Sequence, residues 1–181
     1  MGKIYGMSRR CFAAYAASAV TLGALRAAAG PLMENSKEKP GEDAMTALTP
    51  YLLFDGNCKQ AMQFYQVCFG GELTTMQVKD SPAKDYMPTS FGEKILNARL
   101  KSGNIEFSAS DWLRPDRMRI QGNTVCFYLS SASFEELSAL FDRLSDGGEV
   151  TDPLKEMFFG TYGALNDRFG VRWMFHANKK A

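Results

Sequence analysis

A pattern of helix stop signals occurs twice in this chain and constrains its fold more than any other feature. Residues 70–73 are GGEL and residues 147–150 are GGEV, 77 positions later in a chain of 181 residues. Residues 51–54 (YLLF) and 128–131 (YLSS) are separated by the same offset. Because two different signals share one offset, they indicate an internal duplication of a unit of about 75 residues.

The first copy begins with a strand and a helix. Residues 48–54 form a short apolar run typical of a buried strand. Asn57 is a good N-cap, and Gln60 three residues later would complete a capping box. Gly70 and Gly71 end the helix, since glycine adopts the left-handed conformation at little cost. The predicted apolar face of this helix consists of Ala61, Phe64, Tyr65 and Cys68.

Three further strands complete the first copy. Residues 71–79, 93–101 and 103–111 have strand composition, and residues 102–104 are typical of a tight hairpin. The predicted order of the first half is therefore β-α-β-β-β.

The second copy follows the same plan. We predict strands at 124–130, 160–167 and 171–177. Between the first two, Ser133 caps a helix, and Glu136 would complete a second capping box. The predicted apolar stripe of this helix consists of Phe134, Leu137, Leu140, Phe141 and Leu144.

Three segments between these elements are candidate lids over a pocket. Residues 80–93, 111–122 and 152–163 each mix Pro or Gly with aromatic residues or Met, a composition that suits adaptable apolar contacts. The alternative is that they are surface loops whose apolar residues fill the fold or a dimer interface.

The first 33 residues resemble an export signal. They contain no acidic residue, and Ser8-Arg9-Arg10 precedes an apolar stretch that is too short to span a bilayer. The order S-R-R-x-F is similar to a twin-arginine signal, which predicts a periplasmic protein; without a true signal the protein would be cytoplasmic. An organellar transit peptide and a later start at Met33 or Met45 are the alternatives. Residues 34–47 have the composition of a disordered linker, so the folded domain is predicted to span 48–177, with modules at 48–111 and 122–177.

Charge and cysteine content exclude two classes of protein. The 21 basic residues are balanced by 20 acidic residues, which argues against nucleic-acid binding because phosphate recognition needs a cationic surface. The four cysteines form no C-x-x-C pair, and four in a chain of this length do not predict a disulfide scaffold.

Residues 50–73, 108–111 and 158–175 resemble a known superfamily, the vicinal oxygen chelate proteins, which include glyoxalases, bleomycin-resistance proteins and extradiol dioxygenases. The resemblance is to the PhnB-like branch, often labelled demethylubiquinone methyltransferase-like. It implies an α+β fold in which two βαβββ modules form a curved mixed sheet around a cleft. The methyltransferase label has no support in the sequence, which contains no G-x-G-x-x-G turn after a strand.

Catalytic members of this superfamily hold a divalent metal with His, Glu or Gln side chains from four strands. The corresponding positions fall near Pro50, Glu106, Thr124 and Met174, and the chain has a single histidine, His176. Proline and methionine do not bind a hard divalent ion. We therefore expect no metal cofactor.

Strand alternation predicts which side chains face the implied cleft, because neighbouring residues point to opposite faces of a sheet. Arg99 and Glu106 flank the 102–104 hairpin and could face each other, either as a structural ion pair or as ligand-binding groups. The candidate ligand-binding residues are Asn97, Arg99, Glu106, Ser108, Thr124, Tyr128 and His176.

These observations favour a metal-free protein that binds a small organic ligand and forms a homodimer. One alternative is a lyase-, isomerase- or dioxygenase-like enzyme in which Glu106 acts as general base, with Arg99 or Asn97 stabilising negative charge. Such an enzyme could instead use a divalent metal whose ligands lie one or two residues from the positions given above. The other is a structural module whose cleft is filled by side chains.

Overall fold

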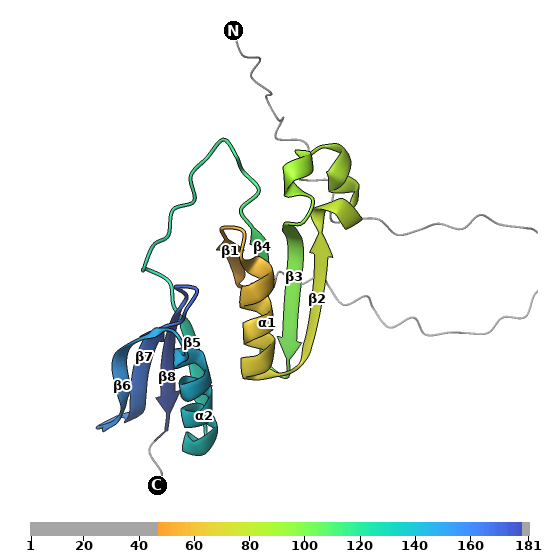
Figure 1. Ribbon diagram of the computed structural model, residues 1–181. Helices are drawn as coiled ribbons and strands as arrows, with labels where there is room; N and C mark the ends of the chain where they lie inside the picture. Colours follow the sequence, from red (N-terminus) through yellow and green to blue (C-terminus); the bar gives the residue numbers. More distant parts are fainter. Residues whose placement is uncertain (1–46, 179–181) are drawn as a thin grey trace, which may run out of the picture. The chain divides into compact units, whose positions relative to one another are not determined.

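The computed structural model describes residues 47–178, which form two modules with the same order of elements (Figure 1). The first contains β1 (Tyr51–Phe54), α1 (Cys58–Phe69), β2 (Glu72–Gln77), β3 (Ile95–Ser102) and β4 (Ile105–Asp111). The second contains β5 (Phe127–Ser131), α2 (Phe134–Ser145), β6 (Glu149–Met157), β7 (Gly160–Asn166) and β8 (Arg172–Ala177). The predicted export signal lies outside the described residues, as does the predicted linker up to residue 46.

The two modules also share one strand topology. Their sheets have the orders β1-β4-β3-β2 and β5-β8-β7-β6. In each sheet the first strand pairs in parallel with the last, and the remaining pairs are antiparallel. This confirms the predicted α+β fold of two βαβββ modules, with the strands hydrogen-bonded as two separate four-stranded sheets.

The repeated glycine pairs have a geometric cause in both modules. Gly70 (φ 70°), Gly71 (φ 83°) and Gly147 (φ 71°) adopt the left-handed conformation that favours glycine. A Cβ atom on Gly71 would overlap the backbone of β3, and one on Gly148 would overlap the backbone at residues 166–167. Each GGE sequence therefore ends a helix and brings the next strand close to its neighbour.

The first predicted capping box is wrong. Asn57 occupies the N-cap of α1, but its side chain makes no capping hydrogen bond. Instead, the backbone N–H of Cys58 donates to Oδ1 of Asp111 at 2.9 Å, and the N–H of Ile95 donates to Oδ2 of the same residue at 2.7 Å. A buried carboxylate from the end of β4 thus performs the capping that the sequence assigned to Asn57 and Gln60.

The second predicted capping box is half correct. The Ser133 hydroxyl accepts a hydrogen bond from the N–H of Glu136 at 3.2 Å. The N–H of Ser133 donates to Oγ of Ser131, so the Glu136 carboxylate does not close the box. That carboxylate instead accepts a hydrogen bond from the Ser131 hydroxyl.

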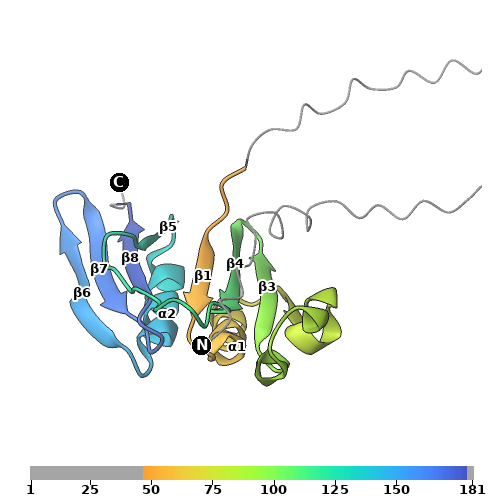
Figure 2. The same cartoon turned by 90° about the horizontal axis from the view of Figure 1, so that it is seen from above.

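Each helix covers one face of its own sheet (Figures 1 and 2). The buried face of α1 includes Ala61, Tyr65 and Cys68, as predicted, and on α2 the residues Leu137 and Leu144 are fully buried. Phe134 was predicted to belong to the apolar stripe of α2, but it is the first residue of the helix and is exposed. None of the helices within residues 47–178 has the length and hydropathy needed to cross a bilayer.

The cores of the two modules are continuous. The ring of Tyr65 on α1 lies 5.8 Å from that of Trp173 on β8, and the rings of Phe107 and Phe127 are 5.9 Å apart. The guanidinium of Arg143 on α2 donates to the carbonyl oxygen of Cys68 on α1 at 3.0 Å. The helix-covered sides of the modules therefore pack into one hydrophobic cluster.

The structure differs from the sequence prediction in two segments. The segment 152–163, expected to be a lid, is most of the β6–β7 hairpin. β5 begins at Phe127 rather than at residue 124, so Thr124 and Cys126 precede the strand. Residues 80–93 are a loop with short 3₁₀ helices, and residues 112–126 connect β4 to β5 without a helix or strand (Figure 2).

Candidate functional site

The face of the first sheet that α1 does not cover carries four of the predicted site residues. On β3, Ala98 and Leu100 are buried against the helix, whereas Asn97 and Arg99 are exposed. On β4, Phe107 is buried and Glu106 and Ser108 are half-buried. The alternation follows from the pleat of a sheet that is covered on one side only.

Arg99 and Glu106 form the ion pair expected from their positions beside the hairpin. The Nε and Nη2 atoms of Arg99 donate to Oε1 of Glu106 at 2.9 and 2.5 Å. Arg99 lies opposite Ser108 in the ladder, so this contact is diagonal across the two strands. The two side chains are 53% and 33% exposed, and an ion pair in such a solvated position contributes little to stability.

A second polar contact extends this face to β1. The Nδ2 atom of Asn97 donates to the hydroxyl of Tyr51 at 3.5 Å. Tyr51 was not among the predicted site residues, although its position at the start of an alternating strand was a usable signal. Together these strands present a guanidinium, an amide, a phenol and a hydroxyl on one surface.

The corresponding face of the second sheet is aromatic. The rings of Tyr128 and His176 are stacked with centroids 6.1 Å apart, and those of His176 and Phe159 are stacked at 6.0 Å. The Nε2 atom of His176 lies 3.3 Å from the carbonyl oxygen of Phe159. Trp173 and Phe175, on the same strand as His176, point into the core. This face therefore offers flat ring surfaces for stacking.

The predicted site residues lie in two groups, one on each sheet, and Thr124 belongs to neither. Tyr128 and His176 form the group on the second sheet, and Thr124 is exposed outside any strand. No hydrogen bond, ion pair or ring contact within residues 47–178 joins the two groups. The residues of the other group, all on the first sheet, are Asn97, Arg99, Glu106 and Ser108.

The metal positions implied by the superfamily do not fit a divalent ion. Glu106 is engaged by Arg99, and Met174 contacts the sulfur of Cys126 through its own sulfur at 3.1 Å. In the described part of the chain, no three His, Cys, Asp or Glu side chains lie close enough to share a metal. Pro50 and Thr124 supply neither imidazole nor carboxylate.

Asp167 is a buried carboxylate that the sequence did not single out. Its Oδ2 accepts hydrogen bonds from the Tyr65 hydroxyl at 2.7 Å and from the Trp173 indole at 2.8 Å. Its Oδ1 accepts from the backbone N–H groups of Phe169 and Val171. Burial, together with the adjacent carboxylate, raises the pKa of Tyr65 above its usual range, so this phenol stays protonated as a donor.

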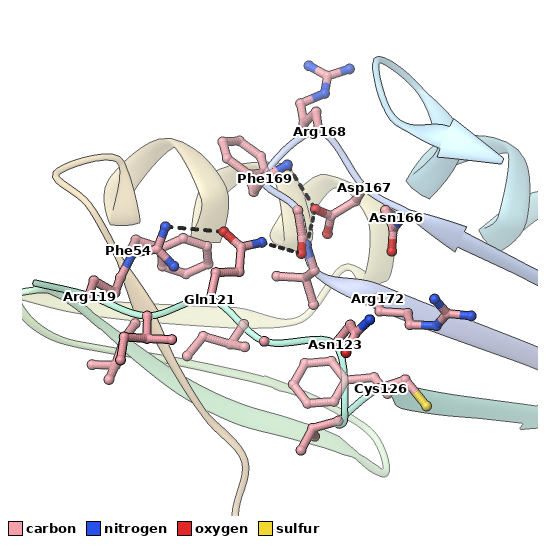
Figure 3. A pocket seen from close by; sticks show the side chains of 18 of the residues that line it. Phe54, Arg119, Gln121, Asn123, Cys126, Asn166, Asp167, Arg168, Phe169 and Arg172 are labelled. Atoms are coloured by element: carbon pink, nitrogen blue, oxygen red, sulfur yellow. Dashed lines mark hydrogen bonds between the residues drawn. The ribbon is translucent and has the colours of Figure 1, made fainter. Parts of the chain in front are cut away.

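A cavity of about 1540 Å³ has Tyr51 among its lining residues. It is bordered by β1, by residues 117–127 and by the turn between β7 and β8 (Figure 3). None of the predicted ligand-binding residues lines it.

A family model and a curated protein both match most of the chain. Residues 46–175 match the family model of 3-demethylubiquinone-9 3-methyltransferase. Protein YjdN of Escherichia coli K12 is 28% identical over 143 residues, a match that covers 74% of this chain and 96% of that protein.

Solved structures share the fold. Protein PA1353 from Pseudomonas aeruginosa is 34% identical with a TM-score of 0.67, covering 75% of this chain and 100% of that one. A putative 3-demethylubiquinone-9 3-methyltransferase, PhnB protein, from Bacillus cereus is 21% identical with a TM-score of 0.59, covering 73% and 99% of the two chains. The chain therefore belongs to the 3-demethylubiquinone-9 3-methyltransferase family.

Proposed function

We propose that this protein binds a small organic molecule on the uncovered faces of its two sheets, without a catalytic metal. The observation that carries the proposal is the composition of these faces. One uncovered face gathers hydrogen-bonding groups, and the other carries the stacked rings of Tyr128, His176 and Phe159. Such a combination of stacking surfaces and a few placed polar groups is typical of small-molecule sites.

The first sheet supplies the polar contacts of the proposed site. Glu106 engages the Nε and Nη2 atoms of Arg99, which leaves Nη1 to donate to a ligand. Asn97 and Ser108 offer further donors and acceptors on the same face. A ligand with a carboxylate or carbonyl group would fit this arrangement.

The second sheet supplies the stacking contacts. Tyr128 and His176 already stack on one another, so a planar ligand would extend an existing column of rings. Because no contact within residues 47–178 joins this column to the polar face, we propose that a homodimer brings the two faces together. The exposure of Tyr51 (50%) and Tyr128 (57%), one on each face, supports burial against a second copy.

An enzymatic role for Glu106 is the second candidate. A carboxylate that acts as general base must have an oxygen lone pair directed at the substrate. Oε1 of Glu106 accepts both hydrogen bonds from Arg99, and this leaves Oε2 for proton transfer. Oε2 is therefore the atom that would act as the base. A Glu106→Gln variant with unchanged ligand affinity and turnover would eliminate the proposed base.

The binding proposal is tested with protein purified without added metal. Elemental analysis should find less than stoichiometric zinc, nickel, iron and manganese, and mass spectrometry should identify a small molecule that co-purifies. Arg99→Gln should lower the co-purified amount at least about tenfold, as loss of a charged hydrogen bond does. Lys59→Gln, an exposed cation on α1, is the matched control and should have no effect.

Stoichiometric metal would overturn the metal-free part of the proposal. Equal recovery of the small molecule from wild type and Arg99→Gln would overturn its placement on the first sheet. Light scattering that shows only monomers at micromolar concentration would overturn the dimer.

Export is the remaining part of the proposal. The S-R-R-x-F sequence near the N-terminus supports a periplasmic location. Replacing Arg9 and Arg10 with Lys should retain the protein in the cytoplasm, and cell fractionation measures this directly. An unchanged distribution would reject the twin-arginine assignment.

A further inference from the structure

The cavity of about 1540 Å³ beside residues 117–127, here called the linker cavity, meets the polar face of the first sheet at Tyr51. The hydroxyl of Tyr51 accepts a hydrogen bond from Asn97 on that face, and the same residue lines the cavity. Leu53, two residues further along β1, lies on the same side of the strand, is exposed and also lines the cavity. The polar face and the linker cavity are therefore continuous along β1.

One row of the first sheet leads from Arg99 to this meeting point. Arg99 lies opposite Ser108 in the ladder of β3 and β4, and Ser108 lies opposite Tyr51 in the ladder of β4 and β1. Neighbouring strands are about 4.8 Å apart, so these two steps place Arg99 about 10 Å from Tyr51 across the strands. A ligand held by Arg99 must therefore extend about 10 Å before its other end reaches the linker cavity.

The charges around the linker cavity balance and leave no surplus for an ionic group. Four arginine side chains line it, and two of them form ion pairs with carboxylates that do not line it. Two further carboxylates line the cavity itself. The groups on the two sides of this balance are Arg117, Arg119, Arg168 and Arg172, and Asp116, Asp146, Glu149 and Asp167. Since an additional ion would find no partner, the cavity suits the uncharged part of a ligand.

Apolar side chains border the linker cavity on the segment between β4 and β5. Ile120 is 90% exposed and Val125 is 77% exposed, and both line the cavity. Hydrogen bonds hold this segment in place, because Gln121 donates to the carbonyl oxygen of Gly170 at 2.9 Å (Figure 3) and the indole of Trp112 donates to the carbonyl oxygen of residue 117 at 2.8 Å. The backbone therefore presents apolar surface beside the cavity, and contact with an apolar group would remove that surface from water.

We propose that the ligand of the first sheet is amphipathic, with a carboxylate or carbonyl group at Arg99 and an apolar chain that crosses β1 into the linker cavity. This inference rests on the proposed function, because it takes the site on the first sheet as given and adds the class of ligand. A short carboxylate would leave the apolar side chains of the cavity in water. A ligand with a charge at both ends would place one charge where the protein charges already balance.

Calorimetric titration of the full chain with octanoate and dodecanoate tests this inference. The extended chain of octanoate is of about the length that separates Arg99 from Tyr51, about 10 Å, so only dodecanoate reaches well into the linker cavity. Each buried methylene group raises affinity about fourfold. We therefore expect dodecanoate to bind at least about thirtyfold more tightly than octanoate.

Variants of the cavity border separate the chain from the carboxylate. Ile120→Asn and Val125→Asn should each weaken dodecanoate binding about tenfold and leave octanoate binding unchanged. Both side chains are exposed, so the variants should fold normally. Val67→Asn, at an exposed valine of α1 that does not line the cavity, is the matched control and should have no effect. Arg99→Gln should weaken the binding of both carboxylates by the same factor.

The outcomes distinguish this inference from the proposed function. Equal affinity for octanoate and dodecanoate, with Arg99→Gln weakening both, would overturn the inference and leave the site on the first sheet intact. Unchanged binding of both carboxylates in Arg99→Gln would overturn that site as well. Unchanged dodecanoate binding in Ile120→Asn and Val125→Asn would place the chain outside the linker cavity. Dodecanoate binding that weakens as protein concentration rises would show that a second copy of the chain covers these side chains instead.

Discussion

Two buried carboxylates, Asp111 and Asp167, join segments that are far apart in the sequence. Asp111 connects the start of β3 to the start of α1, and Asp167 connects α1 in the first module to β8 in the second. Every group that contacts these two carboxylates donates a hydrogen bond to them. No buried side-chain N or O atom within residues 47–178 lacks a partner. Because a charged acceptor forms stronger hydrogen bonds than a neutral one, both residues hold their surroundings firmly.

Asp167→Asn should lower the free energy of unfolding by about 2 kcal/mol. All four groups that contact this carboxylate are donors, so an amide must direct its own N–H groups at two of them. Urea unfolding followed by circular dichroism measures the change. Asp116→Asn, at an exposed carboxylate, is the control and should change stability by less than about 0.5 kcal/mol. Equal stabilities of the two variants would contradict the structural role of Asp167.

At the scale of elements, the two helices are capped in different ways. α1 depends on Asp111, which reaches it from β4, whereas α2 uses its own Ser133. Asp111→Ala should cost about 2 kcal/mol of unfolding free energy, and Ser133→Ala about 1 kcal/mol. Asn57→Ala should cost less than about 0.5 kcal/mol, because its side chain makes no capping bond. Chemical denaturation of the three variants tests this order, and a cost at Asn57 equal to that at Asp111 would refute it.

Alkaline pH should destabilise the protein through α1. Burial, with a smaller effect of Asp111, raises the pKa of Cys58 from 9.0 to about 12, and burial raises that of Cys68 to about 11. The unfolded chain releases these protons from about pH 9, but the folded chain retains them. The free energy of unfolding should therefore fall as pH rises above about 9, by up to about 1.4 kcal/mol per pH unit for each group.

Urea titrations at about pH 8 and about pH 10 measure this dependence. Cys58→Ala should show a shallower fall than wild type, because one of the retained protons is absent. A wild-type stability that does not change between the two pH values would rule out this account of α1.

The elements that the sequence predicted well are those specified by local patterns. Both helices follow from apolar residues at helical spacing and from glycine pairs, and the two-residue turn at Gly103 and Asn104 follows from composition. Residues 152–163 have the Pro, Gly and aromatic composition of a loop, and this hid the strand β6. In the structure Pro153 lies where the ladder shifts register, between Asp152 and Lys155. The pairing of Arg99 with Glu106 was predictable because one short hairpin sets it.

The rest of the candidate site depends on contacts that no local pattern contains. Tyr65 and Asp167 are 102 residues apart, and the cavity of about 1540 Å³ combines β1, a segment without secondary structure and a turn in the second module. Alternation assigns a side chain to a face of its own sheet, but it does not say which two faces meet. For this reason the sequence predicted one site where the described residues form two separate groups.

At the scale of the whole molecule, the duplicated modules share one hydrophobic cluster, and this should make them unfold together. A module that contacts its neighbour through rings, a buried carboxylate and the Arg143–Cys68 hydrogen bond loses these contacts when the neighbour unfolds. In a Trp112→Phe variant, the fluorescence of buried Trp173 reports on the second module and circular dichroism reports on both. The two signals should give the same urea midpoint.

Tyr65→Phe removes one hydrogen bond between the modules and should lower that common midpoint, with a cost of about 1 to 2 kcal/mol in unfolding free energy, because the bond is to a charged group. The two signals should still coincide, since the aromatic contacts of residue 65 with Phe107 and Trp173 remain. Tyr86→Phe, at an exposed tyrosine, should leave the midpoint unchanged. Separate midpoints in the Trp112→Phe parent would mean that the duplicated halves are independent folding units, and the packing between them would then be too weak to couple a ligand on one sheet to the other.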